Sequence, residues 1–324
     1  ENRWEEAAAE LDRYLTFLRT CSAWWYADHS FGNQDLEKWT SCSEIRHVLE
    51  TKDHVTICVE SKERTWELMI YPVVGGFRMV AGKKGFFDGK PEAFSMEESE
   101  HAYIIRSKEH EMILKKETLE ISIDRKAITN LKNISFIFEK ESVSASRIQF
   151  SIHENSAIYG FGERFDSVNQ YGKTVALWQR DACEGCLASI GNQAYKNIPL
   201  VHTSDGFSFF ANTSYRMRMD VGDAVQDYLS VEALGDVFDF YIWSGTPREA
   251  MTAYGTLTGL PIFPPEWVFE PWAGGGGGRW RNGPLQDIAL EQMAAMKKFH
   301  ELDIPHSGFY AEGAGATFYG EYKK

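Results

Sequence analysis

The sequence predicts a mostly β protein, an antiparallel β-sandwich followed by a stretch in which strands and helices alternate. Two observations lead to this fold class. Between residues 44 and 243, short runs with apolar side chains at alternate positions are separated by turn residues, and no long helical pattern interrupts them. From residue 246 the pattern changes to helix, strand, helix and strand. The 324 residues are enough to bury a substantial core in one or two domains.

The first 45 residues are predicted to form a helical segment. Ala8, Leu11, Leu15 and Leu18 recur at helical spacing, and charged residues occupy the other face. We interpret this segment as a packing or oligomerisation element, so an oligomer is one expectation from the sequence.

The sandwich is predicted over residues 46–245. Its clearest strands are runs in which every second residue is apolar, so that alternate side chains point to one face. These runs lie at residues 54–59, 66–71, 102–105, 111–114, 119–123, 134–138, 206–210, 215–219 and 237–243.

A helix and a Pro-rich linker are predicted over residues 246–265. Thr246 is a good N-cap, Pro247 suits the first helical position, and Glu249 completes a capping box, so a helix should run to Leu257. The prolines between residues 261 and 265 form the linker.

Residues 266–324 show the order of a parallel βα unit. An apolar strand is predicted at residues 267–272, a glycine-rich loop at 274–283, a helix at 285–302 and a second strand at 306–312. In a parallel barrel the loops that follow the strands build the site, so the glycine-rich loop is expected at the edge of a pocket.

Composition excludes several functions. The net charge of −13 argues against binding to nucleic acid or to anionic membranes, which requires a basic surface. No apolar run is long enough to span a bilayer. The five cysteines are scattered and odd in number, and the chain starts without the features of a signal peptide, which together favour a cytoplasmic location. A secretion signal that has already been cleaved remains an alternative.

No cofactor or metal is expected. Cys183 and Cys186 have CxxC spacing, but no second pair or histidine cluster completes a zinc site. The glycine run at residues 274–278 lacks the spaced pattern of a phosphate-binding loop.

Residues 159–172, which we call the central corner, combine three glycines with a dense set of polar side chains between aromatic residues. The glycines permit close backbone approach and positive φ. Polar groups beside aromatic rings suit a sugar, which offers both hydroxyls and apolar faces. The alternative is a turn with solvated charges, in which Glu163 and Arg164 pair locally. The polar set consists of Glu163, Arg164, Asp166, Asn169 and Gln170.

The central corner together with Lys173, YGFGERFDSVNQYGK, resembles a signature of family 31 glycoside hydrolases, which include α-glucosidases and α-xylosidases. Two further segments match that family in order: residues 195–212, with YKNIP and SFFAN, and residues 246–267, with TPRE, TGLP and PPEW. The resemblance implies a galactose-mutarotase-like sandwich that leads into a (β/α)8 barrel. The chain would hold only the first strands and helix of this barrel.

The resemblance also implies chemistry. Retaining hydrolysis in this family uses an Asp nucleophile and an Asp acid/base, and double displacement requires the two carboxyl groups to lie about 5 Å apart. Both are expected beyond Lys324, so no catalytic residue is assigned here and this chain alone is expected to be inactive. The complete protein is expected to hydrolyse α-linked oligosaccharides or glycosides without a cofactor. An α-transglycosylase and a non-catalytic carbohydrate-binding protein remain alternatives.

Four residues match substrate-binding positions of the family: Trp272, Glu312, Trp178 and Asp181. Trp272 ends the first predicted barrel strand, and Glu312 ends the second, where the family carries Asp. The longer side chain of Glu moves the acceptor by about one methylene, which leaves the identity of the sugar open. Trp178 and Asp181 resemble the sandwich loop that reaches over the pocket. A structural role is the alternative for each of the four.

Overall fold

The computed structural model describes residues 39–61, 64–140, 142–179, 194–275 and 285–311. The helix predicted near the N-terminus lies outside these ranges. The chain divides into two compact units, residues 1–259 and residues 260–324, which we describe separately.

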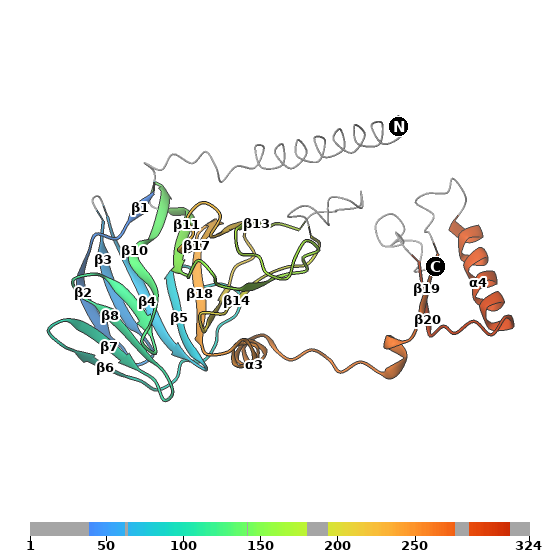
Figure 1. The fold of residues 1–324 in the computed structure, drawn as a ribbon, viewed down its shortest axis with the longest axis horizontal. Helices are drawn as coiled ribbons and strands as arrows, with labels where there is room; N and C mark the ends of the chain where they lie inside the picture. The colour runs from blue at the N-terminus through green and yellow to red at the C-terminus, as the bar shows by residue number, and fades with distance from the viewer. Residues whose placement is uncertain (1–38, 62–63, 141, 180–193, 276–284, 312–324) are drawn as a thin grey trace, which may run out of the picture. The chain divides into compact units, whose positions relative to one another are not determined.

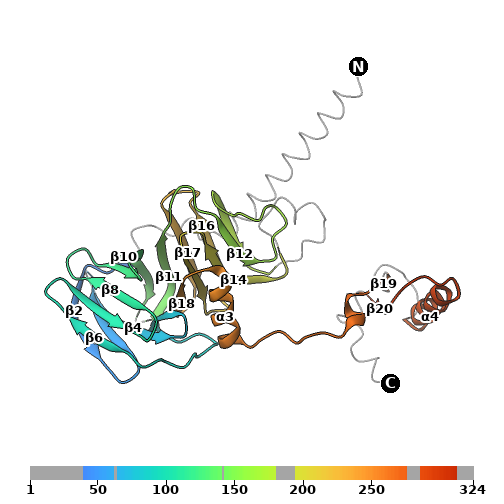
Figure 2. The ribbon, with the colours of Figure 1, turned by 60° about the horizontal axis from the view of Figure 1, so that its bottom comes forward.

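The first unit is a β-sandwich of two antiparallel sheets, as the sequence predicted (Figures 1 and 2). Within the described residues the first sheet has the order β13-β16-β17-β11-β10-β9-β8-β7-β6, and β1 pairs with β10. Its strands are β1 (Thr40–Ser41), β6 (Ser95–Glu98), β7 (Ala102–Arg106), β8 (Glu111–Lys115), β9 (Glu120–Ile123), β10 (Lys126–Glu139), β11 (Ser142–Ser151), β13 (Lys173–Leu177), β16 (Met217–Val221) and β17 (Tyr228–Leu234).

The second sheet has the order β12-β14-β15-β18-β5-β4-β3-β2 in the described part of the chain. Its strands are β2 (Glu44–Glu50), β3 (Val55–Glu60), β4 (Thr65–Val73), β5 (Gly76–Gly82), β12 (Ile158–Gly162), β14 (Asn197–Thr203), β15 (Phe207–Ala211) and β18 (Val237–Ser244). Because β1 and β2 begin at Thr40 and Glu44, strand structure starts before residue 46.

The main core lies between the two sheets. In β3 the alternate residues Val55, Ile57 and Val59 are buried, as period-two patterning requires. Phe150 of β11 and Phe209 of β15 stack with 4.3 Å between ring centroids, so the two sheets are joined by direct aromatic packing.

A second apolar cluster covers the outer face of the second sheet. Helix α3 (Pro247–Thr258) begins at the predicted capping box of Thr246 and Glu249, and it packs Ala250 and Ala253 against Tyr241 and Trp243. Strand β18 is therefore buried on both faces, which explains its nearly continuous apolar sequence. The predicted helix is confirmed, and it belongs to the sandwich unit, which ends at Gly259.

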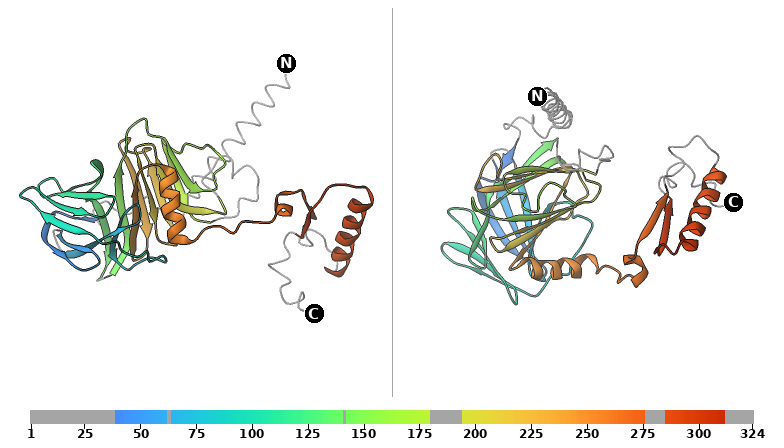
Figure 3. Two further views of the ribbon diagram at one scale, coloured as in Figure 1. Left: turned by 90° about the horizontal axis from the view of Figure 1, so that it is seen from below. Right: turned by 45° about the vertical axis from the view of Figure 1, so that its right-hand side comes forward.

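The second unit contains a parallel βαβ arrangement. Strand β19 (Trp272–Gly275) pairs in parallel with β20 (Gly308–Ala311), and α4 (Leu285–Glu301) connects them in sequence and runs beside the pair (Figure 3). The helix and the second strand agree with the predicted segments. None of the described helices has the length and apolar character needed to cross a membrane.

The first strand of this unit differs from the prediction. Residues Glu266–Phe269 form a 3₁₀ turn, η2, and the strand begins at Trp272 instead of ending there. The 3₁₀ turn and Pro271, which has no N–H to donate to a strand ladder, lie between the predicted start of the strand and the observed one. Gly274 and Gly275 consequently belong to the strand and not to the predicted loop.

Candidate functional site

The central corner begins in strand β12, where Gly160 and Gly162 both have positive φ. A Cβ atom at Gly160 would overlap the carbonyl oxygen of Leu200, and one at Gly162 would overlap that of Lys196, both on the neighbouring segment. The register of β12 against β14 shifts between these two glycines. The glycines therefore allow a close, irregular strand pairing that no other residue permits.

Most polar side chains of the corner hold the corner together. Asn169 Oδ1 accepts hydrogen bonds from Ile158 N at 2.9 Å and Tyr171 N at 3.1 Å. Asp166 accepts from Lys173 Nζ at 2.7 Å and from Gln170 Nε2 at 3.0 Å. Burial raises the pKa of Asp166, but these hydrogen bonds outweigh it and leave the pKa below its usual value.

The two remaining charged groups point to different partners. Arg164 Nη2 donates to Asn197 Oδ1 at 2.6 Å, and the Glu163 carboxylate lies 3.9 Å from Lys196 Nζ. The polar residues that suggested a sugar site thus have structural uses in this corner. Asn197 connects the corner to a pocket beside it.

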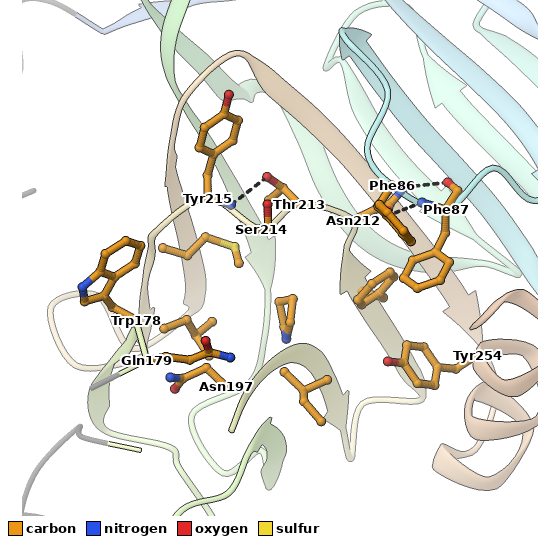
Figure 4. A pocket seen from close by; sticks show the side chains of 15 residues that line it. Phe86, Phe87, Trp178, Gln179, Asn197, Asn212, Thr213, Ser214, Tyr215 and Tyr254 are labelled. Carbon is orange, nitrogen blue, oxygen red and sulfur yellow. Dashed lines mark hydrogen bonds between the residues drawn. The ribbon is translucent and has the colours of Figure 1, made fainter. Parts of the chain in front are cut away.

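The pocket has a volume of about 520 Å³ and lies on the sandwich unit (Figure 4). In Figure 4, Trp178 and Gln179 stand on one side of the pocket, and Phe86, Phe87 and Tyr254 on the other. The lining residues are Phe86, Phe87, Leu177, Trp178, Gln179, Asn197, Ile198, Pro199, Phe210, Asn212, Thr213, Ser214, Tyr215, Met217 and Tyr254.

The lining is aromatic and polar but uncharged. None of these 15 residues, all within the described part of the chain, carries a charge. Amides from Gln179 and Asn197 and hydroxyls from Thr213 and Ser214 offer donors and acceptors between aromatic rings. Such a lining suits a neutral ligand that has both hydroxyl groups and apolar faces.

One wall of the pocket is the loop between β5 and β6, which carries Phe86 and Phe87. Beneath it lies Arg78, only 1% exposed, which donates from Nε and Nη2 to the two carboxylate oxygens of Asp239 at 2.8 and 2.6 Å. Burial opposes the charge of Arg78, but the hydrogen bonds with Asp239 and Asp88 outweigh it and raise its pKa.

Three backbone N–H groups of this loop donate hydrogen bonds to buried side chains, one of which is Asp239. Gly85 N donates to Asp239 Oδ2 at 2.7 Å, and Phe87 N donates to Asn212 Oδ1 at 2.9 Å. Gly89 N donates to the Tyr241 hydroxyl at 2.9 Å. We call Arg78, Asp239, Asn212 and Tyr241 the anchoring network, because they fix this loop from beneath.

A family model described as the glycosyl hydrolase 31 N-terminal galactose mutarotase-like domain matches residues 51–220, more than half of the chain. The chain belongs to glycosyl hydrolase family 31. The matched residues fall within the sandwich unit, so the family resemblance seen in the sequence is confirmed and its galactose-mutarotase-like sandwich is this unit.

The sequence relatives include an α-xylosidase and an α-glucosidase. The chain is 34% identical over 166 residues to the α-xylosidase XylQ of Lactiplantibacillus pentosus, covering 51% of this chain and 21% of that protein. It is 24% identical over 226 residues to α-glucosidase 2 of Bacillus thermoamyloliquefaciens, covering 67% of this chain and 27% of that protein. The chain thus spans about a fifth to a quarter of the length of these relatives.

Two solved structures show the same fold. The cycloalternan-forming enzyme of Listeria monocytogenes, solved with a pentasaccharide substrate, superposes with a TM-score of 0.69 at 17% identity, covering 84% of this chain and 26% of that one. The Flavobacterium johnsoniae family 31 dextranase gives a TM-score of 0.63 at 21% identity, covering 84% and 34%.

The predicted site residues fall in different places. Trp178 lines the pocket, and the Arg216 guanidinium lies 5.9 Å from the centre of its ring. Trp272 belongs to the second unit, where its Nε1 donates to Val268 O at 3.1 Å and its ring lies 5.5 Å from that of Trp267. Asp181 and Glu312 lie outside the described residues.

Several pocket residues were not anticipated from the sequence. Phe86 and Phe87 are adjacent aromatic residues enclosed by Gly85 and Gly89 in a polar stretch, and that unusual pattern is a signal that could have marked them. Tyr254 is on α3, and only the packing of that helix brings it to the pocket.

The described part of the chain contains no group of three or more His, Cys, Asp or Glu residues arranged to hold a metal ion. Cys183 and Cys186 lie outside it.

Proposed function

We propose that this chain is the N-terminal part of a retaining α-glycosidase, which hydrolyses α-linked glycosides of a hexose or pentose by double displacement. Family membership supports the reaction class, and the similarity to α-xylosidases and α-glucosidases supports the substrate class. The observation that carries the proposal for this chain is the uncharged aromatic pocket that contains Trp178. We assign that pocket to contacts with the sugar.

In this proposal the pocket binds but does not react. Double displacement requires two carboxyl groups about 5 Å apart, one to attack the anomeric carbon and one to protonate the leaving oxygen. The residues that line the pocket include no carboxyl group. We therefore propose that both reacting Asp residues come from a (β/α)8 barrel beyond residue 324, and that β19, α4 and β20 are its first elements.

The proposal includes a compartment and a set of partners. We propose a cytoplasmic enzyme that needs no cofactor and that acts on free oligosaccharides or glycosides. The odd number and scattered placement of the five cysteines in the sequence support a reducing compartment. The net charge of −13 supports a neutral ligand rather than a nucleic acid or an anionic membrane.

The test compares two products of the same gene. The 324-residue chain and a longer product that continues into the barrel are assayed with aryl α-xyloside and aryl α-glucoside. We expect turnover only from the longer product, with net retention of anomeric configuration. Turnover by the 324-residue chain would refute the assignment of the reacting carboxylates.

Two alternatives have distinct outcomes. An α-transglycosylase of the same family would give oligosaccharide products when an acceptor sugar is added to the longer product. A non-catalytic carbohydrate-binding protein would bind saccharides through the pocket but show no turnover in either form. The pocket on the sandwich is the observation that keeps this second alternative in view.

A further inference from the structure

The side chain of Phe86 combines unusual exposure with a fixed backbone. Its ring is 88% exposed, whereas most large apolar side chains of the sandwich are buried. The residues on either side are tied down, because Gly85 N donates to Asp239 and Phe87 N donates to Asn212. A Cβ atom at Gly85 would overlap the carbonyl oxygen of Asn212, so the loop runs directly against the strand end beneath it. The Phe86 ring is therefore exposed to solvent while hydrogen bonds on both sides fix the backbone that carries it.

The ring also belongs to the pocket. It packs edge-on against Phe87 with 5.1 Å between ring centroids, and the ring centroid of Phe87 lies 6.0 Å from that of Phe210, another lining residue. Trp178 stands at the other side of the pocket (Figure 4). Two aromatic surfaces therefore border a volume of about 520 Å³ with uncharged donors and acceptors between them.

We propose that Phe86 is a sugar-stacking platform of this pocket, and that the anchoring network positions it. The inference rests on the proposed carbohydrate function and adds a specificity-determining residue to it. An apolar pyranose face packs on a flat ring, and a rigid ring loses less conformational entropy on binding than a mobile one. The uncharged lining selects a neutral saccharide over an anionic ligand.

Tyr241 is the positioning residue best suited to a test. Its hydroxyl accepts from Gly89 N at 2.9 Å and donates to Phe87 O at 3.1 Å, while its ring is packed in the second apolar cluster. Tyr241→Phe removes both loop contacts and keeps the ring. The substitution should increase the mobility of the loop between β5 and β6, which carries Phe86, without unfolding the sheet.

The test measures binding of isomaltotriose and of methyl α-xyloside to the 324-residue chain by calorimetric titration. Phe86→Ala should weaken binding about 3- to 10-fold, the range expected for one aromatic stacking contact. Phe86→Trp should retain affinity, and Phe86→Leu, which keeps bulk but lacks a π face, should lose it. Phe165→Ala removes an exposed ring outside the pocket lining and serves as the matched control.

A double-mutant cycle separates positioning from general stability. Tyr241→Phe should weaken binding in the wild-type background and have no further effect in the Phe86→Ala background, because it acts through Phe86. Equal effects in both backgrounds would refute the positioning role. Binding that is lost in Trp178→Ala but unchanged in Phe86→Ala would refute the platform and leave the proposed function intact. Absence of binding by the wild-type chain would overturn the platform and the assignment of this pocket to sugar contacts, whereas the reaction class is judged separately by turnover of the longer product.

Discussion

The substitution Asp239→Ala should remove most of the stability that the anchoring network provides. The Asp239 side chain is fully buried, and it is the bidentate partner of an Arg78 guanidinium that is only 1% exposed. After the substitution, that guanidinium keeps Asp88, whose side chain is largely exposed, and the carbonyl of Phe87. Breaking a buried pair from one side costs about 3–5 kcal/mol, because the remaining charge loses its buried counterion.

That loss is large against a total stability of about 5–15 kcal/mol for a domain. With a urea m-value of about 3 kcal/mol per molar for a unit of this size, the unfolding midpoint should fall by about 1–2 M. Urea titration followed by near-ultraviolet circular dichroism measures the shift. Glu97→Ala is the control: Arg106 lies 2.7 Å from Glu97 in an exposed pair, which should contribute at most about 1 kcal/mol. A midpoint for Asp239→Ala equal to that of the control would refute the reasoning.

Three further predictions concern packing, capping and pH. Phe150→Ala should cost about 3–5 kcal/mol in urea unfolding, because it opens a cavity where the two sheets meet. Thr246→Ala should cost about 1 kcal/mol and speed amide exchange in α3, because it deletes half of the capping box. Burial lowers the pKa of His202 from its ordinary value of 6.5, so the free energy of unfolding should fall as pH drops below about 6.5.

Each of these has a matched comparison. Phe165→Ala deletes an exposed ring and should leave the urea midpoint unchanged within error. Thr252→Ala alters an exposed position in the interior of α3, so an equal effect there would mean that capping is not responsible. The pH dependence should shrink in His202→Gln and persist in His101→Gln, whose imidazole is exposed. A profile unchanged by His202→Gln would show that another group titrates.

The sandwich could be predicted from the sequence because its strands carry their own evidence. In Val55–Glu60 the apolar residues Val55, Ile57 and Val59 recur at alternate positions, and that pattern fixes which face is buried. The start of the parallel pair could not be read in this way. The apolar run at residues 267–272 satisfies a strand template, but Glu266–Phe269 form a 3₁₀ turn, and a run this short does not distinguish the two.

The site was less accessible from the sequence. The sequence does not distinguish a polar residue that contacts a ligand from one that stabilises a turn. In the central corner, Asn169 and Asp166 stabilise the turn. The pocket unites residues that are distant in sequence, such as Phe86, Trp178 and Tyr254. Their meeting depends on sheet order and on the docking of α3, and neither is encoded locally. Trp178 was found by family resemblance and not from its neighbours.

The docking of α3 has a practical meaning for anyone who wants the sandwich as a free-standing fragment. Truncation after the last strand, at Ser244, would remove α3, expose Tyr241 and Trp243 to solvent, and leave an aggregation-prone sheet. Truncation after Gly259 would keep α3. Immediately beyond it, Ile262 and Phe263 are more than nine-tenths exposed, so a protease of broad specificity should trim the chain there first. The smallest soluble form of this β domain should therefore end in a helix.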